Sequence, residues 1–142
     1  MTEIMVVVGI LGILAAVAGP NMITMVRTQK LKTAAFDVFS SLNFARSEAI
    51  KRNRAVTVTP TNGDWARGWR ITDAANTVLR DQSGWEDITL VGPATVTFGS
   101  NGRPTAPAAQ QFNLSAYNVA SAKKRCISLD LSGRAVSKEG AC

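Results

Sequence analysis

The fold is decided by one stretch, residues 4–26, which reads IMVVVGILGILAAVAGPNMITMV and carries no charge. As a helix rising about 1.5 Å per residue it would extend roughly 35 Å, which is enough to cross the hydrocarbon core of a bilayer. The run is too long for the apolar part of a secretory signal, and no A-x-A site precedes a polar start. The simplest interpretation is a single membrane anchor.

Two features of this stretch are unusual for an inert anchor. Glu3 lies at its edge, where a carboxylate is costly unless a cation accompanies it, such as the N-terminal amine of a neighbouring subunit. Gly9, Gly12, Gly19 and Pro20 all lower the stability of a helix in this run. We therefore expect the stretch to do more than hold the chain in lipid.

Composition argues against most catalytic and metal-binding classes. The chain has 142 residues, a net charge of +6 and no histidine, so it lacks the commonest general base and metal ligand. Its two cysteines cannot form a four-ligand zinc site. No phosphate-binding loop, calcium loop or G-x-S-x-G motif occurs in the sequence. We expect no enzyme, no metal and no cofactor, but an apolar rod joined to one soluble domain.

The helix is expected to continue beyond the apolar run to about Arg54. Apolar positions recurring every three or four residues predict one buried stripe, made of Val26, Phe36, Phe39, Leu42, Ala45, Ala49 and Ile50. Residues 46–54, RSEAIKRNR, are rich in cations, as suits the C-terminal end of a helix dipole; a patch for a partner or nucleic acid is the alternative. The second half of the helix should pack on a sheet, whereas the first half has no such partner within the chain.

Beyond Arg54 the apolar pattern changes to a period of two, which predicts short strands between turns. The expected strands cover residues 55–59, 65–72, 77–80, 88–91, 94–98, 111–116, 124–131 and 134–137, with a turn at 60–64 and a loop at 104–110. The fold class is therefore α+β, with a long N-terminal helix packed by its second half on an antiparallel sheet or sandwich. We divide the chain into an apolar membrane or filament-core helix at 1–26, an amphipathic helix half at 27–54 and a β-rich head at 55–142.

The head contains two further patterns that predict structure. Trp65 and Trp69 lie four residues apart and should face the same side of a strand, as a core pair that anchors the sheet on the helix or, alternatively, as a stacking platform for a sugar or nucleotide. Cys126 and Cys142 would close a 17-residue loop if bridged, contributing about 3 kcal/mol in an oxidising compartment; unpaired thiols are the alternative.

The region around these cysteines is basic. Its cations are Lys123, Lys124, Arg125, Arg134 and Lys138, opposed by Asp130 and Glu139. Such a cluster could bind DNA phosphates in a salt-dependent and sequence-independent way, because no aromatic residue lies between 123 and 142 for stacking on bases. A solvated surface or a subunit interface is the alternative interpretation.

The start of the chain, from Glu3 to Asn21, resembles that of type IV pilins and type II secretion pseudopilins, with Glu3 and Pro20 at the family's spacing. The resemblance implies a single-pass inner-membrane subunit with its C-terminal domain in the periplasm, which assembles with other major and minor pilins. It implies that Glu3 neutralises a neighbour's N-terminal amine and that Pro20 lets the helix loosen during assembly. In family precursors a basic leader ending in glycine comes first; here Met1 and Thr2 precede Glu3.

Three further segments resemble the GspH/FimT branch of that superfamily: residues 45–69, with DWARGW at 64–69; FGSNGR at 98–103; and RCISLDLSGR at 125–134. The branch implies a minor pilin that helps to initiate or cap a pilus, or alternatively a GspH-type pseudopilin of type II secretion. Some FimT proteins are DNA receptors for natural transformation, and Gly133, Arg134 and Cys142 match their C-terminal pattern. Val136 stands at the second arginine of that pattern, which leaves only Lys138 nearby as a replacement charge.

Overall fold

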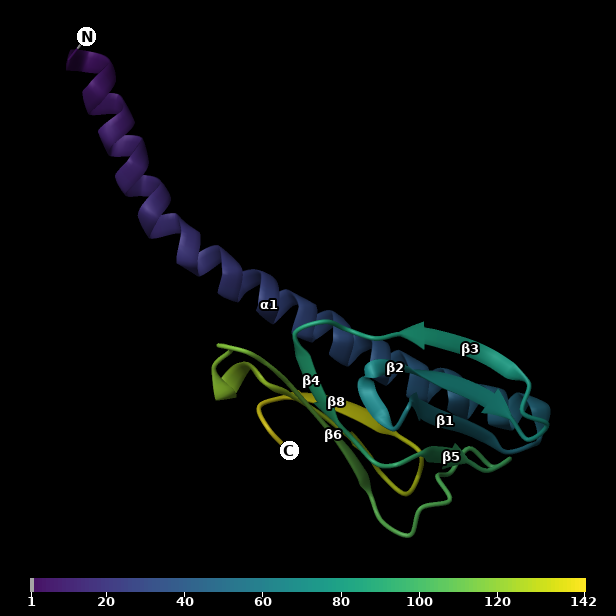
Figure 1. The fold of residues 1–142 in the computed structure, drawn as a ribbon. Helices are drawn as coiled ribbons and strands as arrows, with labels where there is room; N and C mark the ends of the chain where they lie inside the picture. Colours follow the sequence, from purple (N-terminus) through teal and green to yellow (C-terminus); the bar gives the residue numbers. More distant parts are fainter. Residues whose placement is uncertain (1) are drawn as a thin grey trace.

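The computed structural model describes residues 2–142, except for the side chains of residues 15–21 and 122. One helix, α1 (Thr2–Arg52), runs from the N-terminus into the head (Figure 1). It ends two residues before the expected Arg54 because Asn53 adopts a left-handed conformation, with φ of 51°. The amide of Asn53 then donates to Ile50 O and that of Arg54 to Ala49 O, each at 3.2 Å, which is a Schellman cap.

The buried face of α1 differs from the predicted stripe. Leu42, Ala45 and Ala49 are buried as expected, but Val26, Phe36 and Ile50 are more than half exposed. The rest of the buried face consists of Leu31, Ala34, Ala35, Val38 and Ser41. The sequence analysis chose Phe36 for the buried face because it is larger and more hydrophobic than the neighbouring alanines. The small alanines lie on that face instead, where they let the sheets approach the helix closely.

The head consists of two four-stranded antiparallel sheets that pack on the second half of α1 (Figure 1). The first has the order β3-β2-β1-β5 and the second β4-β6-β7-β8. Their bounds are β1 (Val56–Thr61), β2 (Asp64–Asp73), β3 (Val78–Ser83), β4 (Ile88–Val91), β5 (Val96–Phe98), β6 (Gln110–Ala116), β7 (Arg125–Leu129) and β8 (Ala135–Glu139). The α+β fold class predicted from the sequence is confirmed.

The first hairpin corrects the expected end of β1. Pro60 was expected in a turn but lies in β1 opposite Trp69. It is tolerated because β5 pairs only with Val56–Val58, so β1 has a neighbour on one side at Pro60, and a bulge follows directly. The turn is confined to Asn62 and Gly63, whose φ values of 52° and 77° suit a tight hairpin connection.

The two tryptophans of β2 form part of the core that joins the sheets. Trp65 and Trp69 are almost fully buried, with ring centroids 6.0 Å apart, which excludes an exposed stacking platform. Trp65 contacts Phe112 of β6 edge to face at 4.9 Å and donates its indole N–H to Pro93 O at 2.7 Å. The pair is a core pair as predicted, but Trp65 bridges the two sheets. Gly68 between them has φ of 107°, and a Cβ there would collide with the carbonyl of Gln82 on β3.

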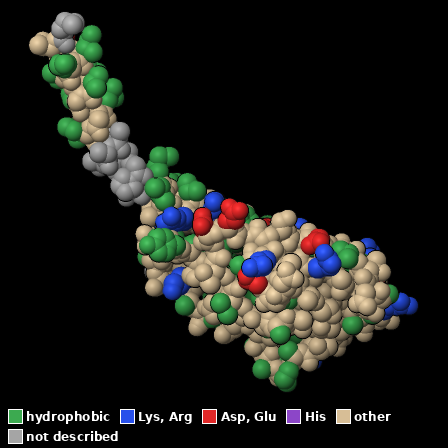
Figure 2. All heavy atoms as spheres, in the orientation of Figure 1, with side chains coloured by type: hydrophobic (Ala, Val, Ile, Leu, Met, Phe, Trp, Pro, Cys, Tyr) green, Lys and Arg blue, Asp and Glu red, His purple; other side chains and the backbone are tan. Residues whose placement is uncertain are grey.

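The first half of α1 extends away from the head and carries apolar side chains that no other described part of the chain covers (Figures 1 and 2). Ile4, Met5 and Ile13 are among those more than half exposed. Within the described residues, no helix meets the combined length and hydropathy criteria for crossing a membrane.

Candidate functional site

The acidic residue of the apolar run lies at the free end of α1. Glu3 is in the first turn of the helix, exposed, and beside Ile4 and Val7. A carboxylate in the first turn interacts favourably with the positive end of the helix dipole. Its position leaves the carboxylate open to a group from outside the chain. The side chain of Pro20, the other residue assigned to assembly, lies outside the described residues.

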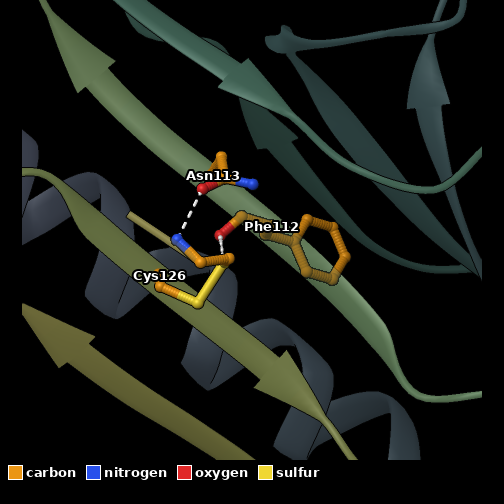
Figure 3. Close-up of a disulfide and its surroundings, with 4 residues drawn as sticks. Phe112, Asn113 and Cys126 are labelled. Carbon is orange, nitrogen blue, oxygen red and sulfur yellow. Dashed lines mark hydrogen bonds between the residues drawn. A yellow bond between two sulfur atoms is a disulfide. The ribbon is translucent and has the colours of Figure 1, made fainter. Parts of the chain in front are cut away.

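A disulfide joins Cys126 of β7 to Cys142, as expected. Figure 3 shows this bridge beside Phe112 and Asn113 of the neighbouring strand β6. The backbone N–H of Cys142 donates to the Asn113 side-chain oxygen at 2.9 Å, and its sulfur lies 3.4 Å from Phe112 O. The C-terminal segment is therefore fixed against the outer face of the second sheet by one covalent and one hydrogen-bonded contact.

The structure separates the five cations that were predicted as one patch. Arg125 lies on the inner face of β7, in line with the buried Ile127 and Leu129. Its guanidinium is 2.6 Å from the carboxylate of Glu139 on β8, and its Nε is buried without a hydrogen-bond partner among the residues that the structure describes. Lys123 precedes β7 in a 3-10 turn and lines a hollow together with Arg125. Lys124 is half-buried beside them.

The other two cations belong to a different surface. Lys138 is exposed on β8, opposite the disulfide-bonded Cys126, so it lies on the outer face of the second sheet. Arg134 lies at the far end of the same hairpin, in the turn between β7 and β8. Strand alternation puts Arg134, Val136 and Lys138 on one side, with Val136 interrupting the charges. The hairpin thus carries one cationic cluster at its base and two spaced cations along its outer face.

The turn that presents Arg134 is held by Asp130. Its carboxylate accepts the backbone N–H groups of Ser132 and Arg134 at 2.8 and 3.0 Å and the Ser132 hydroxyl at 2.6 Å. The Ser132 hydroxyl and the Arg134 amide lower the pKa of Asp130 below its ordinary value. Asp130 therefore holds the turn, and the nearby charge of Arg134 also contributes to its lowered pKa.

Sequence reasoning missed a contact between two glycine turns. An added Cβ at Gly133 would collide with the carbonyl of Gly102 and approach Arg46 of α1. Gly102 in turn packs on Ile50 and Arg46. The turns of FGSNGR and LSGR therefore meet on the last turns of α1. The dipeptides Asn101-Gly102 and Ser132-Gly133 indicate two turns in the sequence. Nothing in the sequence indicated that these turns are in contact.

A profile of the family described as Type II transport protein GspH matches residues 34–133. The chain belongs to the GspH family. The match covers the packed part of α1 and the head up to the β7–β8 turn, so it includes both glycine turns and the tryptophan pair. No curated protein matches the chain.

Solved structures similar to this GspH-family chain include a minor pilin and a minor pseudopilin. The type IV minor pilin FimU of Pseudomonas aeruginosa is 26% identical, with a TM-score of 0.68 over 78% of this chain and 89% of FimU. A second crystal form of FimU gives 27% identity and a TM-score of 0.66 over 76% and 92% of the two chains. The minor pseudopilin EpsH of the Vibrio cholerae type II secretion system is 14% identical, with a TM-score of 0.61 over 78% and 97%, and shares the fold.

Proposed function

We propose that the chain is a minor pilin, a structural subunit anchored in the inner membrane with its head in the periplasm. The observation that carries this proposal is the apolar half of α1, which extends beyond the head and whose described side chains are uncovered. Such a surface is stable in water only when something else buries it. Lipid covers it before assembly and the helices of other pilins cover it in the filament.

The same helix gives Glu3 its role in assembly. A carboxylate at the edge of an apolar bundle is costly unless a cation neutralises it. Glu3 is exposed in the first turn of α1, so the N-terminal amine of a neighbouring subunit can reach it. This pairing fixes the axial position of one subunit against the next. Pro20 serves assembly by allowing local loosening of the helix.

The subunit is proposed to help initiate or cap a type IV pilus. The likeness to FimU supports this assignment, because it covers 89% of FimU at 26% identity. The likeness to EpsH, at 14% identity, concerns the fold alone. The alternative is a GspH-type pseudopilin of a type II secretion system, to which the family description refers.

The experiment that tests the proposal is deletion of the gene in its own host, with surface pili counted by electron microscopy and secreted proteins measured in parallel. Loss of pili, restored by the natural chain and not by Glu3→Ala, supports the minor pilin. Glu86→Ala, which removes an exposed acid of the head, is the matched control and should restore pili. Normal pili with a defect in secretion would favour the pseudopilin, and no defect in either would contradict both.

Binding of double-stranded DNA is a second candidate, favoured by the spacing of Arg134 and Lys138 on the outer face of the β7–β8 hairpin. A four-residue strand separation is about 13 Å, so the two side chains can reach phosphates of the same duplex. Arg125 contributes less because Glu139 pairs with it. Lys123 and Lys124 would contact DNA only if the duplex followed the hairpin to its base.

A further inference from the structure

The end of the head at which α1 enters it brings together cations from segments far apart in the sequence. Lys32 of α1, Lys123 of the 3-10 turn and Arg125 of β7 line a hollow of about 160 Å³ with Thr28 and Glu139. The carboxylate of Glu139 is taken up by Arg125 at 2.6 Å, which leaves the two lysines without a carboxylate in the hollow. The Nε of Arg125 is buried and has no partner within the described residues.

A second contact lies beside the hollow on the same level of α1. The guanidinium of Arg27 lies 5.5 Å from the centre of the Tyr117 ring and donates to Tyr117 O at 3.4 Å. Tyr117 is the only tyrosine of the chain, and its side chain is 73% exposed. We call Arg27, Lys32, Tyr117, Lys123 and Arg125 the basic collar.

The collar follows the apolar run directly. Arg27 comes immediately after the uncharged residues 4–26, and Lys32 lies about 7.5 Å further along the helix axis. With its long side chain, Lys32 can reach back to the level of lipid headgroups. Tyrosine is enriched at this level because its ring is apolar and its hydroxyl is polar. No acid occurs in residues 27–36 or 118–129, so the segments that form the collar add no opposing charge of their own apart from Glu139.

We propose that the basic collar binds the phosphate of anionic phospholipids and holds the head against the bilayer before assembly. This inference rests on the proposed membrane anchoring of the subunit. The two lysines supply the donors, and Tyr117 lies among the glycerol groups. The collar adds polar contacts with lipid phosphates to the apolar contacts that the helix makes with the acyl chains. Both sets of contacts are broken when the subunit leaves the membrane for a filament.

The test uses the full chain in neutral detergent micelles, so that detergent covers the apolar helix in every sample. Phosphatidylglycerol and phosphatidylcholine with identical acyl chains are titrated, and bound lipid is counted by native mass spectrometry. The expected result is a preference for phosphatidylglycerol that falls on the order of ten-fold or more in the double variant Lys32→Ala/Lys123→Ala, since each cation near an anionic surface contributes about 1 kcal/mol.

The double variant Arg134→Ala/Lys138→Ala is the matched control, because it removes the same charge from the outer face of the hairpin. It should keep the preference within about two-fold. Equal binding of both lipids by the natural chain, or equal losses in the two double variants, would overturn the proposal. Binding of a short DNA duplex is measured in the same samples. If the duplex binds and Lys32→Ala/Lys123→Ala weakens that binding, while phosphatidylglycerol shows no such dependence, the collar is a nucleic-acid surface and the lipid proposal fails.

The lipid-binding experiment and the pilus-restoration experiment can fail independently of each other. A chain that does not restore pili can still show the lipid preference, which would leave the collar standing and the minor pilin contradicted. A chain that restores pili and shows no preference would contradict the collar alone.

Discussion

The indole ring of Trp65 on β2 lies edge to face against Phe112 on β6, with ring centroids 4.9 Å apart. The two residues belong to different sheets, so this contact joins the halves of the head. Both side chains are buried, and the Trp65 N–H is satisfied by Pro93 O. The contact lies in the core that the two sheets share with α1.

Replacement of either ring should destabilise the head strongly. We expect Trp65→Ala and Phe112→Ala each to lower the free energy of unfolding by about 3–5 kcal/mol, because each removes a large buried side chain. The double variant should lose less than the sum by about 0.5–1.5 kcal/mol, the coupling typical of an aromatic pair. Denaturant unfolding measures this cycle, with the exposed Leu131→Ala as control. Additive losses would mean that the rings do not stabilise each other.

Removal of the disulfide should cost about 3 kcal/mol, as expected for a closed loop with a sequence separation of 16. The double variant Cys126→Ser/Cys142→Ser is compared with the oxidised natural chain by thermal unfolding. Reducing agent should lower the melting temperature of the natural chain and leave that of the variant unchanged. A natural chain insensitive to reductant would contradict the prediction.

Gly133 should be far less tolerant of substitution than Gly63. Both have φ near +80°, so Gly133→Ala and Gly63→Ala carry a similar backbone strain of about 1–3 kcal/mol. An added Cβ at Gly63 enters open space, whereas at Gly133 it collides with the carbonyl of Gly102. The excess loss of stability at Gly133 therefore measures the contact between the two glycine turns. Equal losses would show that the turns can separate without cost.

The Asp130 carboxylate should make the β7–β8 turn sensitive to acid. Because its pKa is lower in the folded chain than its ordinary value of 3.8, its ionised form contributes stability above that pH. This contribution is lost as the pH falls through the lowered folded pKa. Asp130→Asn keeps an oxygen acceptor and should flatten this part of the pH dependence, whereas Asp130→Ala should lower stability at every pH. The free energy of unfolding, measured between pH 2 and about 7, tests both variants. If Asp130→Asn loses as much stability at low pH as the natural chain, other carboxylates cause that loss.

DNA binding by the full chain, if it occurs through the hairpin, should depend on salt. Each phosphate contact contributes about −0.9 to the slope of log affinity against log salt. Arg134→Ala/Lys138→Ala should therefore reduce the slope by about 2. Arg67→Ala/Arg70→Ala, which removes two exposed cations of β2 in the other sheet, is the charge-matched control. Absence of binding at low salt, with the disulfide intact, would remove DNA binding from the functions of this chain.

The sequence predicted the elements of the fold better than the contacts between them. Period-two alternation located the strands within a few residues, because it reflects which side chains face the core. The three- and four-residue spacing of large apolar residues did not predict the buried face of α1 correctly, since Phe36 is exposed while Ala34 and Ala35 are buried. Pro60 was placed in a turn because its position beyond the β5 pairing depends on sheet order, which no local pattern contains.

The candidate site was predictable in its local parts only. The pairing of Cys126 with Cys142 followed from there being no other cysteine. The five cations, treated as one patch because they are close in sequence, lie at different ends and faces of one hairpin. The contact of Arg27 with Tyr117 joins residues 90 positions apart, so it becomes visible only when the chain is folded.

The course of α1 also determines how the subunit bears mechanical load. The helix that leaves the head is the same helix that packs, from Leu31 to Ala49, against both sheets. Tension applied to its free half acts along the helix axis and loads these contacts in shear, all at once. Peeling the strands apart one by one would require a force in another direction. In the proposed filament, axial tension would therefore load all of these contacts of the subunit together.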